Sequence, residues 1–326
     1  MTKKTTTILA AMGLAALPGL AMAQDDAACG DLSITEMDWA SAAIVTSVAT
    51  FLMEQGYGCN VTKVPSSTTP ALVSVSENGT PDIVTELWIN GTPAYEELSE
   101  AGTIATLTDV LSDGGIEGWW IPTYLAEEHP ELTTLQGVLD NPDLVGNRFH
   151  QCPEGWGCKN ANASLAEAAD LEGHGIEVFQ HGSGETMATS IAAAFENQEP
   201  WLGYYWAPTS VLGKYDMTMV DLGPYDEEIH TCNLDPECEE VGLSSYPVGP
   251  VKTVVTTSFE EQHPDIAELL TNVQFTNDQM GEVLAWQEDN NATANEAAVH
   301  FLTTYADTWQ GWVNETAREN LSALLQ

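Results

Sequence analysis

The chain has 326 residues, of which 49 are acidic and 8 are basic, so its formal net charge at pH 7 is −41. A charge of this size and sign repels nucleic acid and anionic membranes, and we expect neither as a partner. The same charge is typical of a surface adapted to a salty medium, although it also raises the local concentration of cations.

The first residues have the layout of a secretory signal peptide. Two lysines precede an apolar run over residues 8–20, and Ala21 and Ala23 place small residues two apart before Gln24. The run is too short to span a bilayer, so we predict a signal peptide at 1–23, with a membrane anchor as the alternative. The mature chain then has 326 − 23 = 303 residues and a formal charge of 6 − 49 = −43, because two of the eight basic residues are removed. Export of this kind predicts a protein outside the cytoplasm. We expect it in the periplasm of a Gram-negative cell.

Six cysteines, all after residue 23, fit an oxidising compartment. Two pairs are each separated by five residues that include a proline, which is typical of a small disulfide-closed loop. The predicted disulfides are Cys152–Cys158, Cys232–Cys238 and, by elimination, Cys29–Cys59. A zinc site is the alternative, but the spacings are poor for zinc ligands and export disfavours free thiolates.

Strand and helix patterns alternate through the first third of the chain. Strands are expected at 31–39, 60–64 and 82–87, and helices at 41–55, 69–78 and 95–101. This rhythm predicts an α/β fold with mainly parallel sheets flanked by helices. Ligands bind beyond the carboxyl ends of the strands in such sheets, and Trp39 and Trp88 stand at those ends.

The pattern restarts near residue 118. A helix at 183–196, a buried strand at 201–206 and a strand at 251–255 are expected, followed by helices at 264–273, 278–289 and 295–316. The chain has no internal repeat and no long linker, which favours two closely connected lobes. We predict that residues 24–117 and 246–326 form one lobe and that residues 118–245 form the other.

Ten tryptophans in a chain so poor in lysine suggest a site for a methylated cation. The face of an indole ring attracts quaternary ammonium groups, and cages of aromatic rings are the recurring solution. Tryptophan is also a common core residue, so only those in positions typical of a ligand site are candidates. Trp39 and Trp88 end strands, Trp156 lies in a cysteine-closed loop, and Trp206 precedes Ala-Pro at a strand end.

Two motifs resemble those of the glycine betaine/choline/trimethylamine N-oxide-binding proteins. They are Cys152-Pro153-Glu154-Gly155-Trp156-Gly157-Cys158 and Tyr204-Tyr205-Trp206-Ala207-Pro208, and segment 82–88 and the C-terminal helix with Trp309 and Trp312 fit the same family. The resemblance implies a type II periplasmic binding fold whose two lobes close on a ligand in the cleft between them. It also implies the substrate-binding protein of an ABC importer, which acts with permease subunits in the inner membrane, and we expect a monomer.

The same resemblance implies Trp88, Trp156 and Trp206 as cage residues. Trp39 and Trp120 are added from their placement in the chain.

The other end of the ligand separates the candidate compounds. A betaine carboxylate usually requires arginine, histidine or several backbone N–H groups, and the only arginines are Arg148 and Arg318. A betaine-binding branch of the resembling family has a histidine where this chain has Thr92. Trimethylamine N-oxide is therefore favoured, choline comes second, and glycine betaine is a further alternative. Glu131 is expected either to face the cation or to hold a water against the N-oxide oxygen, unless it is a solvated surface residue.

Two further functions are considered. Asp235, Glu237 and Glu239 lie in a disulfide-closed loop and are candidate ligands of a structural calcium ion, although a solvated acidic loop is the simpler interpretation. No cofactor is otherwise expected.

The chain lacks the motifs of a serine hydrolase, a phosphate-binding loop or a zinc protease, so we expect a binding protein rather than an enzyme. A binding lobe that reports to a sensor has the same pocket and remains an alternative to an importer.

Overall fold

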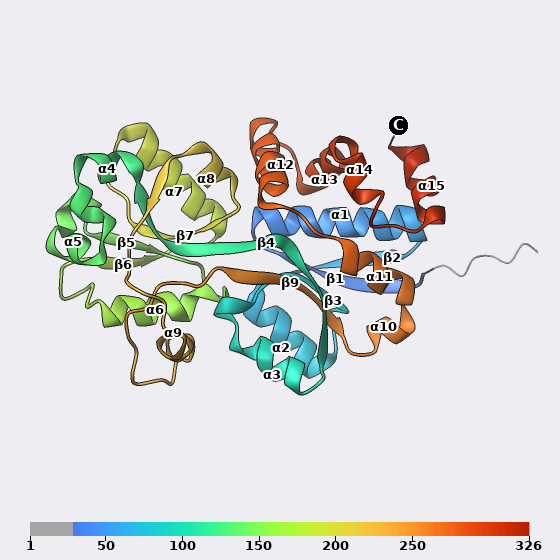
Figure 1. Ribbon diagram of the computed structural model, residues 1–326, viewed down its shortest axis with the longest axis horizontal. Coiled ribbons are helices and arrows are strands. Elements are labelled where there is room, and N and C mark those ends of the chain that lie inside the picture. Colours follow the sequence, from blue (N-terminus) through green and yellow to red (C-terminus); the bar gives the residue numbers. More distant parts are fainter. Residues whose placement is uncertain (1–28, 326) are drawn as a thin grey trace, which may run out of the picture.

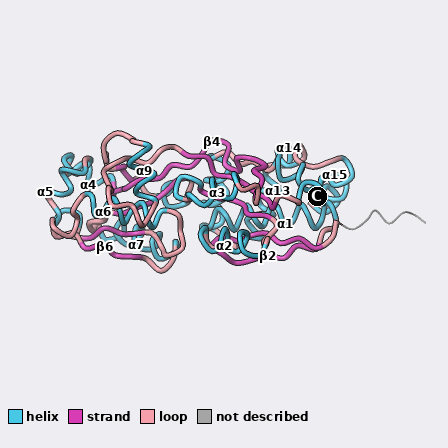
Figure 2. The backbone as a smooth tube through the Cα atoms, turned by 90° about the horizontal axis from the view of Figure 1, so that it is seen from below, coloured by secondary structure: helices cyan, strands magenta, loops and turns pink. Residues whose placement is uncertain are grey.

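The computed structural model describes residues 29–325, so the predicted signal peptide lies outside the described residues. The elements form two groups along the long axis, joined by two long strands, β4 (Ile104–Pro122) and β9 (Gly249–Thr256) (Figure 1). We call β1–β3 with α1–α3 and α10–α15 the first lobe, and β5–β8 with α4–α9 the second lobe. The side view shows the same two lobes next to each other (Figure 2). Among residues 29–325, no helix combines the length and the hydrophobicity needed to cross a bilayer.

The first lobe begins with the alternation that the sequence predicts. Its first elements are β1 (Asp31–Met37), α1 (Ala40–Tyr57), β2 (Asn60–Ser66), α2 (Thr68–Asn78), β3 (Ile83–Trp88), the 3-10 turn η1 (Ile89–Gly91) and α3 (Pro93–Glu100). Helix α1 ends at Gly58, whose φ of +73° is the left-handed conformation that favours glycine. Each of the six expected elements is present within a few residues of its predicted bounds.

The second lobe contains mostly shorter elements. They are α4 (Thr123–Glu128), η2 (Pro130–Thr133), α5 (Leu135–Asp140), η3 (Pro142–Val145), β5 (Arg148–Gln151), α6 (Cys158–Ala168), β6 (Glu177–Gln180), α7 (Gly184–Asn197), β7 (Gly203–Ala207), α8 (Ser210–Lys214), β8 (Met217–Met219) and α9 (Glu227–Leu234). Ser183 caps α7 as expected, because its side chain accepts a hydrogen bond from the backbone N–H of Thr186.

The sheet is mixed rather than mainly parallel. Its strand order is β2-β1-β3-β9-β4-β7-β5-β6, with β8 paired to β4. Strand β1 is parallel to β2 and β3, and β5 is parallel to β6 and β7, so each lobe keeps the predicted parallel core. Strands β4 and β9 pair antiparallel with each other and with their neighbours. The fold is therefore α/β, and two antiparallel strands carry the chain from one lobe to the other.

The C-terminal region differs from the expected long helix at 295–316. The helices after β9 are α10 (Phe259–Gln262), α11 (Pro264–Asn272), α12 (Asn277–Asp289), α13 (Ala294–Thr304), α14 (Ala306–Trp309) and α15 (Glu315–Leu324). Asn314 accepts a hydrogen bond from the Ala317 N–H and so starts a new helix after a turn. Trp309 and Trp312 are buried in the core of the first lobe, where Trp312 stacks on Phe301.

The three predicted disulfides are confirmed. Cys29 pairs with Cys59, Cys152 with Cys158, and Cys232 with Cys238, and no described cysteine is free. The first disulfide joins the beginning of β1 to the beginning of β2, and the other two close short loops in the second lobe.

Candidate ligand-binding site

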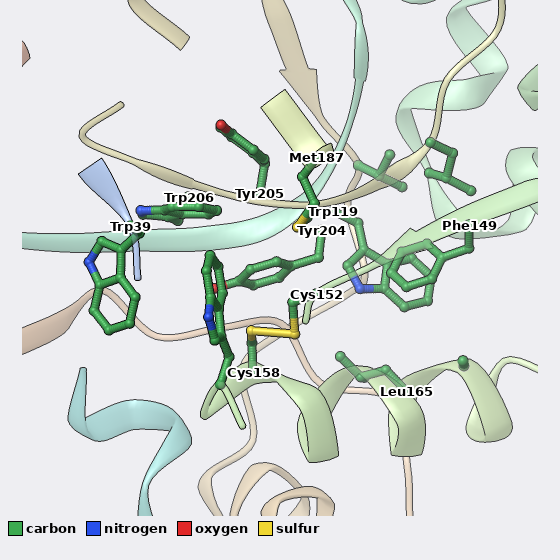
Figure 3. Packing of buried hydrophobic residues seen from close by; sticks show 14 of the residues in the cluster. Trp39, Trp119, Phe149, Cys152, Cys158, Leu165, Met187, Tyr204, Tyr205 and Trp206 are labelled. Carbon is green, nitrogen blue, oxygen red and sulfur yellow. A yellow bond between two sulfur atoms is a disulfide. The ribbon is translucent and has the colours of Figure 1, made fainter. Parts of the chain in front are cut away.

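A cavity lies between the two lobes and is lined by four tryptophans. Its walls are Trp39, Thr68, Trp88, Gly91, Glu117, Trp156, Gly157, Cys158, Tyr204 and Trp206. Figure 3 shows Trp39, which precedes α1, near Trp206 and Tyr204 of β7, with the disulfide between Cys152 and Cys158 beside them. Four of the five tryptophans predicted for the site are thus brought together.

Each tryptophan is placed by the end of an element or by a loop. Trp39 is the residue before α1 and Trp88 is the last residue of β3, so both come from the first lobe. Trp156 lies in the disulfide-closed loop and Trp206 in β7, so both come from the second lobe. The Trp156 ring stands at 67° to Trp39 and at 82° to Trp206, with centroids 5.3 and 5.0 Å apart. Rings in such edge-to-face arrangements form adjacent walls of the cavity.

The loop that carries Trp156 is in direct contact with the first lobe. The indole Nε1 of Trp156 donates a hydrogen bond to Asp38 Oδ1 at 2.8 Å. The Thr69 N–H donates to the carbonyl of Gly155 at 3.1 Å. A Cβ placed on Gly157 would lie 2.8 Å from the carbonyl oxygen of Gly91, so the backbones approach as closely as glycine allows. The lobes therefore meet at the cavity itself.

A buried carboxyl group, Glu117 of β4, forms part of the cavity wall. It lies opposite Trp206 in the register between β4 and β7. Tyr204 Oη donates a hydrogen bond to Glu117 Oε1 at 2.6 Å, whereas Oε2 is buried and has no partner among the described residues. Burial raises the pKa of Glu117 to about 7, against the smaller opposing effects of the Tyr204 hydroxyl and the nearby Asn90 amide. The cavity thus offers one polar group that can accept or donate a proton near neutral pH.

A second buried carboxyl group, Glu86 of β3, lies behind two of the tryptophans. Its Oε1 accepts hydrogen bonds from Trp39 Nε1 at 2.6 Å, from Ser41 Oγ at 2.6 Å and from Trp88 Nε1 at 3.4 Å. Burial raises the pKa of Glu86 to about 7, and the three hydrogen bonds act in the opposite direction.

Two residues predicted for the site lie elsewhere. Trp120 is in β4, but its Nε1 donates to the carbonyl of Tyr205 at 3.1 Å and the ring does not line the cavity. Glu131 is in η2, where its half-exposed side chain lies 3.5 Å from Nδ1 of His129. Both residues were predicted from their position in the chain alone. In the structure, neither Trp120 in β4 nor Glu131 after α4 is directed towards the other tryptophans.

The proposed calcium ligands do not gather around a common point. Asp235, Glu237 and Glu239 are exposed, and Asp235 Oδ1 accepts a hydrogen bond from the Glu237 N–H at 2.9 Å, which closes a turn. Within residues 29–325, no group of three or more acidic, histidine or cysteine side chains is arranged to hold a metal ion. The structure therefore gives no support to a calcium site in this loop.

Sequence reasoning missed the two buried glutamates. In a chain with 49 acidic residues, an acidic residue within a strand is not conspicuous. The available signal was position: Glu86 lies two residues before Trp88, and Glu117 two residues before the Trp119-Trp120 pair. Tyr204 lies in the Tyr204-Tyr205-Trp206-Ala207-Pro208 motif, but nothing in the sequence indicates its contact with Glu117.

Comparison with known proteins agrees with this geometry. Residues 30–304 match the family described as the substrate binding domain of the ABC-type glycine betaine transport system. The chain belongs to this family. Its proteins are substrate-binding proteins of ABC transporters for glycine betaine and choline that work outside the cytoplasm or in the periplasm; they are not enzymes and need no cofactor.

Solved structures show the same fold at low sequence identity. One is an ABC-transporter choline binding protein in complex with choline, which has a TM-score of 0.75 at 17% identity. The alignment covers 91% of this chain and 99% of that chain. A glycine betaine/L-proline-binding protein (ProX) from Borrelia burgdorferi has a TM-score of 0.73 at 17% identity, with 89% of this chain and 99% of that chain covered. Lactococcal OpuAC, closed on glycine betaine, has a TM-score of 0.69 at 18% identity, with 87% and 100% covered. The predicted two-lobed type II periplasmic binding fold is confirmed.

Proposed function

We propose that this family member captures a small methylated amine for an ABC importer, with trimethylamine N-oxide favoured and choline or glycine betaine uptake for osmoprotection as the alternative. The observation that carries the proposal is the interlobe cavity whose walls include four indoles and the carboxyl group of Glu117. The methyl groups of the ligand lie against the ring faces, and its polar end lies near Glu117.

The four rings are sufficient to supply most of the binding energy. A desolvated contact between a cation and an indole face is worth about 2 kcal/mol, so three or four such contacts give roughly 6–8 kcal/mol before costs are subtracted. Micromolar affinity requires about 8 kcal/mol net. Burial of the methyl groups and a bond to the polar end of the ligand supply the remainder.

The polar surroundings favour a ligand without a carboxylate. No lysine or arginine is among the described residues that line the cavity. Arg148 forms an exposed ion pair with Glu177, and Arg318 lies in α15 with its guanidinium near the carbonyl of Val313. Thr92 Oγ1 donates to the carbonyl of Trp88 at 2.7 Å and is not directed to a ligand. A betaine carboxylate would meet the Glu117 carboxyl group instead of a cation, which is unfavourable when both are ionised.

Glu117 suits the polar end of both remaining candidates. When protonated, its free Oε2 can donate a hydrogen bond to the oxygen of trimethylamine N-oxide, a strong acceptor. When ionised, the same oxygen can accept a hydrogen bond from the hydroxyl of choline. The N-oxide is ranked first because its oxygen is bonded directly to the nitrogen, which suits a cavity in which Glu117 and the indoles line the same small space.

The wider organisation follows from the same proposal. Residues 24–117 with 246–326 and residues 118–245 act as the two lobes, and β4 and β9 act as the connection about which they close. The proposed protein is a periplasmic monomer of a Gram-negative cell, exported by the signal peptide at 1–23, and its closed form docks on the permease in the inner membrane.

One titration series tests the proposal. Purified mature protein is titrated calorimetrically with trimethylamine N-oxide, choline and glycine betaine, and tryptophan fluorescence is followed in parallel. We expect trimethylamine N-oxide to bind most tightly, choline next and glycine betaine most weakly. Tight binding of glycine betaine alone would overturn the choice of ligand, and binding of none of the three would overturn the proposed function.

A further inference from the structure

One oxygen atom of Glu86 connects two walls of the cage. Trp39 precedes α1 and Trp88 ends β3, yet both indole N–H groups donate to Glu86 Oε1, together with Ser41 Oγ. Glu86 is fully buried, and its second oxygen, Oε2, has no hydrogen-bond partner among the described residues. An oxygen that accepts three donors is typical of an ionised carboxylate, because hydrogen bonds to a charged acceptor are the strong ones.

The backbone of Glu86 is held in an unfavourable conformation. Its φ is +50°, a left-handed value that a residue with a side chain rarely adopts. The register between β3 and β9 shifts between Val84 and Leu87, so Glu86 lies in an irregularity of the strand. Such irregularities redirect side chains, and their cost is of the order of 1–3 kcal/mol. Strain of this kind, together with a buried carboxyl group, requires a benefit elsewhere in the molecule.

The Trp88 ring is also confined from its other side. A Cβ placed on Gly115 of β4 would lie 2.1 Å from Trp88 Cζ3, so the ring fits only because residue 115 is glycine. The ring face is thus set by Gly115 and the N–H edge by Glu86. Trp39 is buried, and without Glu86 its N–H would lose its partner.

We propose that Glu86 is a positioning residue that fixes the indoles of Trp39 and Trp88 and places a negative charge at their N–H edges, so that the site prefers a cation to a neutral molecule of the same shape. An N–H group that donates to an anion is polarised, and the electron density of its ring rises. A more electron-rich ring attracts a methylated cation more strongly. This inference rests on the proposed function and names the property by which the site chooses its ligand.

The test compares choline with its neutral analogue, the alcohol in which a tert-butyl group replaces the trimethylammonium group. Glu86→Gln keeps an oxygen that can accept from the indoles but removes the charge. We expect choline affinity to fall at least tenfold, about 1.4 kcal/mol, and affinity for the neutral analogue to fall less than about threefold. Equal losses for both compounds would show a merely structural role, and unchanged choline affinity would show no role; either result overturns the proposal.

Two control variants separate Glu86 from other acidic groups. Glu96→Gln removes an exposed charge from α3 in the same lobe and is expected to leave both affinities unchanged. Glu117→Gln removes the other buried carboxyl group and is expected to affect the polar end of the ligand without loosening Trp39 or Trp88.

A second measurement requires no ligand and leaves Glu86 unchanged. The indole N–H resonances of isotopically labelled wild-type protein are followed as pH is varied, with Trp39→Phe and Trp88→Phe used for assignment. We expect the signals of Trp39 and Trp88 to shift together with one midpoint, whereas Trp309, which donates to the carbonyl of Leu302, stays constant. Asp38 accepts a hydrogen bond from Trp156 Nε1, so any titration of Asp38 is followed on the separate Trp156 signal.

Independent behaviour of Trp39 and Trp88 in this titration, or no shift in either, would overturn the proposal. A protein that binds no methylated amine would overturn the proposed function, and the resonances would still decide whether Glu86 holds the two rings.

Discussion

At the scale of single residues, the cage is defined by rings that face one another rather than by tryptophan content. In the second lobe, the ring centroids of Trp156 and Trp206 lie 5.0 Å apart. Trp156 also contacts Trp39 of the first lobe. Replacing either ring of the second lobe removes one buried wall. We expect Trp156→Ala and Trp206→Ala each to weaken ligand binding at least tenfold, about 1.4 kcal/mol or more, as measured by calorimetry.

The matched control for the cage variants is Trp286→Phe. Trp286 stacks on His300 outside the cavity, with ring centroids 4.0 Å apart, so its replacement is expected to leave affinity unchanged. Melting curves establish that each variant is folded. Folded cage variants that bind as tightly as the wild-type protein would contradict the assignment of these rings.

Glu117 predicts a pH dependence of stability. Burial raises its pKa from 4.5 to about 7, so the folded state binds the proton more tightly than the unfolded state. The contribution of this group to the free energy of unfolding is therefore largest below its unfolded pKa and is lost as the pH rises through 7. Glu117→Gln cannot ionise but still offers an oxygen to Tyr204 Oη. We expect the variant to gain stability relative to the wild-type protein between acid and mildly alkaline pH, by roughly 2–3 kcal/mol.

Chemical denaturation of both proteins at several pH values measures this difference. Glu86 has a similarly raised pKa, but it is present in both proteins, so its effect cancels in the comparison. A difference in the free energy of unfolding that does not vary with pH would show that Glu117 titrates normally.

At the scale of elements, the disulfide between Cys152 and Cys158 holds the loop that carries Trp156. Replacing both cysteines with alanine is expected to loosen this loop, so that Trp156 is less ordered before binding and the affinity falls several-fold. The loss of stability should be about 2 kcal/mol for a loop of this length. Calorimetric titration and thermal unfolding measure the two effects.

The chain contains a matched control for this change. Cys232 and Cys238 have the same sequence separation of 6, but their loop does not line the cavity. Their replacement should lower stability to a similar degree without lowering affinity. Equal losses of affinity in the two double variants would indicate a general loosening of the second lobe.

The elements also show what could be predicted from the sequence. The first helices and strands of the first lobe were predicted well because clear end signals bound them, such as Gly58 after α1 and Gly79 after α2. Strand β4 was missed because Ser112-Asp113-Gly114-Gly115, in the middle of its 19 residues, is typical of a turn and interrupts the strand pattern. The single helix predicted at 295–316 is divided into shorter helices in the structure. The breaks were missed because side-chain caps, such as that of Asn314, are weak signals within an apolar pattern.

The site was predicted in part for a related reason. Trp39, Trp88, Trp156 and Trp206 stand at strand ends or in a closed loop, where sequence position carries information about direction. Glu86 and Glu117 lie within strands, and their roles depend on which side chains of distant elements reach them. Only the folded chain brings Ser41 or Tyr204 to these carboxyl groups.

At the scale of the whole molecule, ligand capture depends on how closely the two lobes approach. The described contacts between them include the hydrogen bond from Trp156 to Asp38, the close approach of Gly157 to Gly91 and the ring contact between Trp39 and Trp156. A ligand that touches both lobes adds contacts that exist only when the lobes are together, so it shifts the balance towards closure. Ligand affinity should then respond to substitutions that alter the energy of the closed form alone.

Gly157→Ala tests this coupling between closure and binding. The φ and ψ of Gly157 are −60° and −34°, so alanine fits the local backbone and introduces no strain there. In the closed form, however, its Cβ would lie 2.8 Å from the Gly91 carbonyl oxygen and 3.0 Å from Thr92 Oγ1. Overlap of this kind costs roughly 1–3 kcal/mol, and it arises only when the lobes meet.

We therefore expect Gly157→Ala to lower affinity about tenfold while leaving thermal stability without ligand nearly unchanged. X-ray scattering should show a smaller ligand-induced decrease in the radius of gyration than in the wild-type protein. The control is Gly281→Ala in α12, where a Cβ meets nothing within 4 Å and alanine favours the helix. If Gly157→Ala binds and compacts like the wild-type protein, the contact between Gly91 and Gly157 is not part of closure, because backbones that touch only in the closed form must respond to an added methyl group.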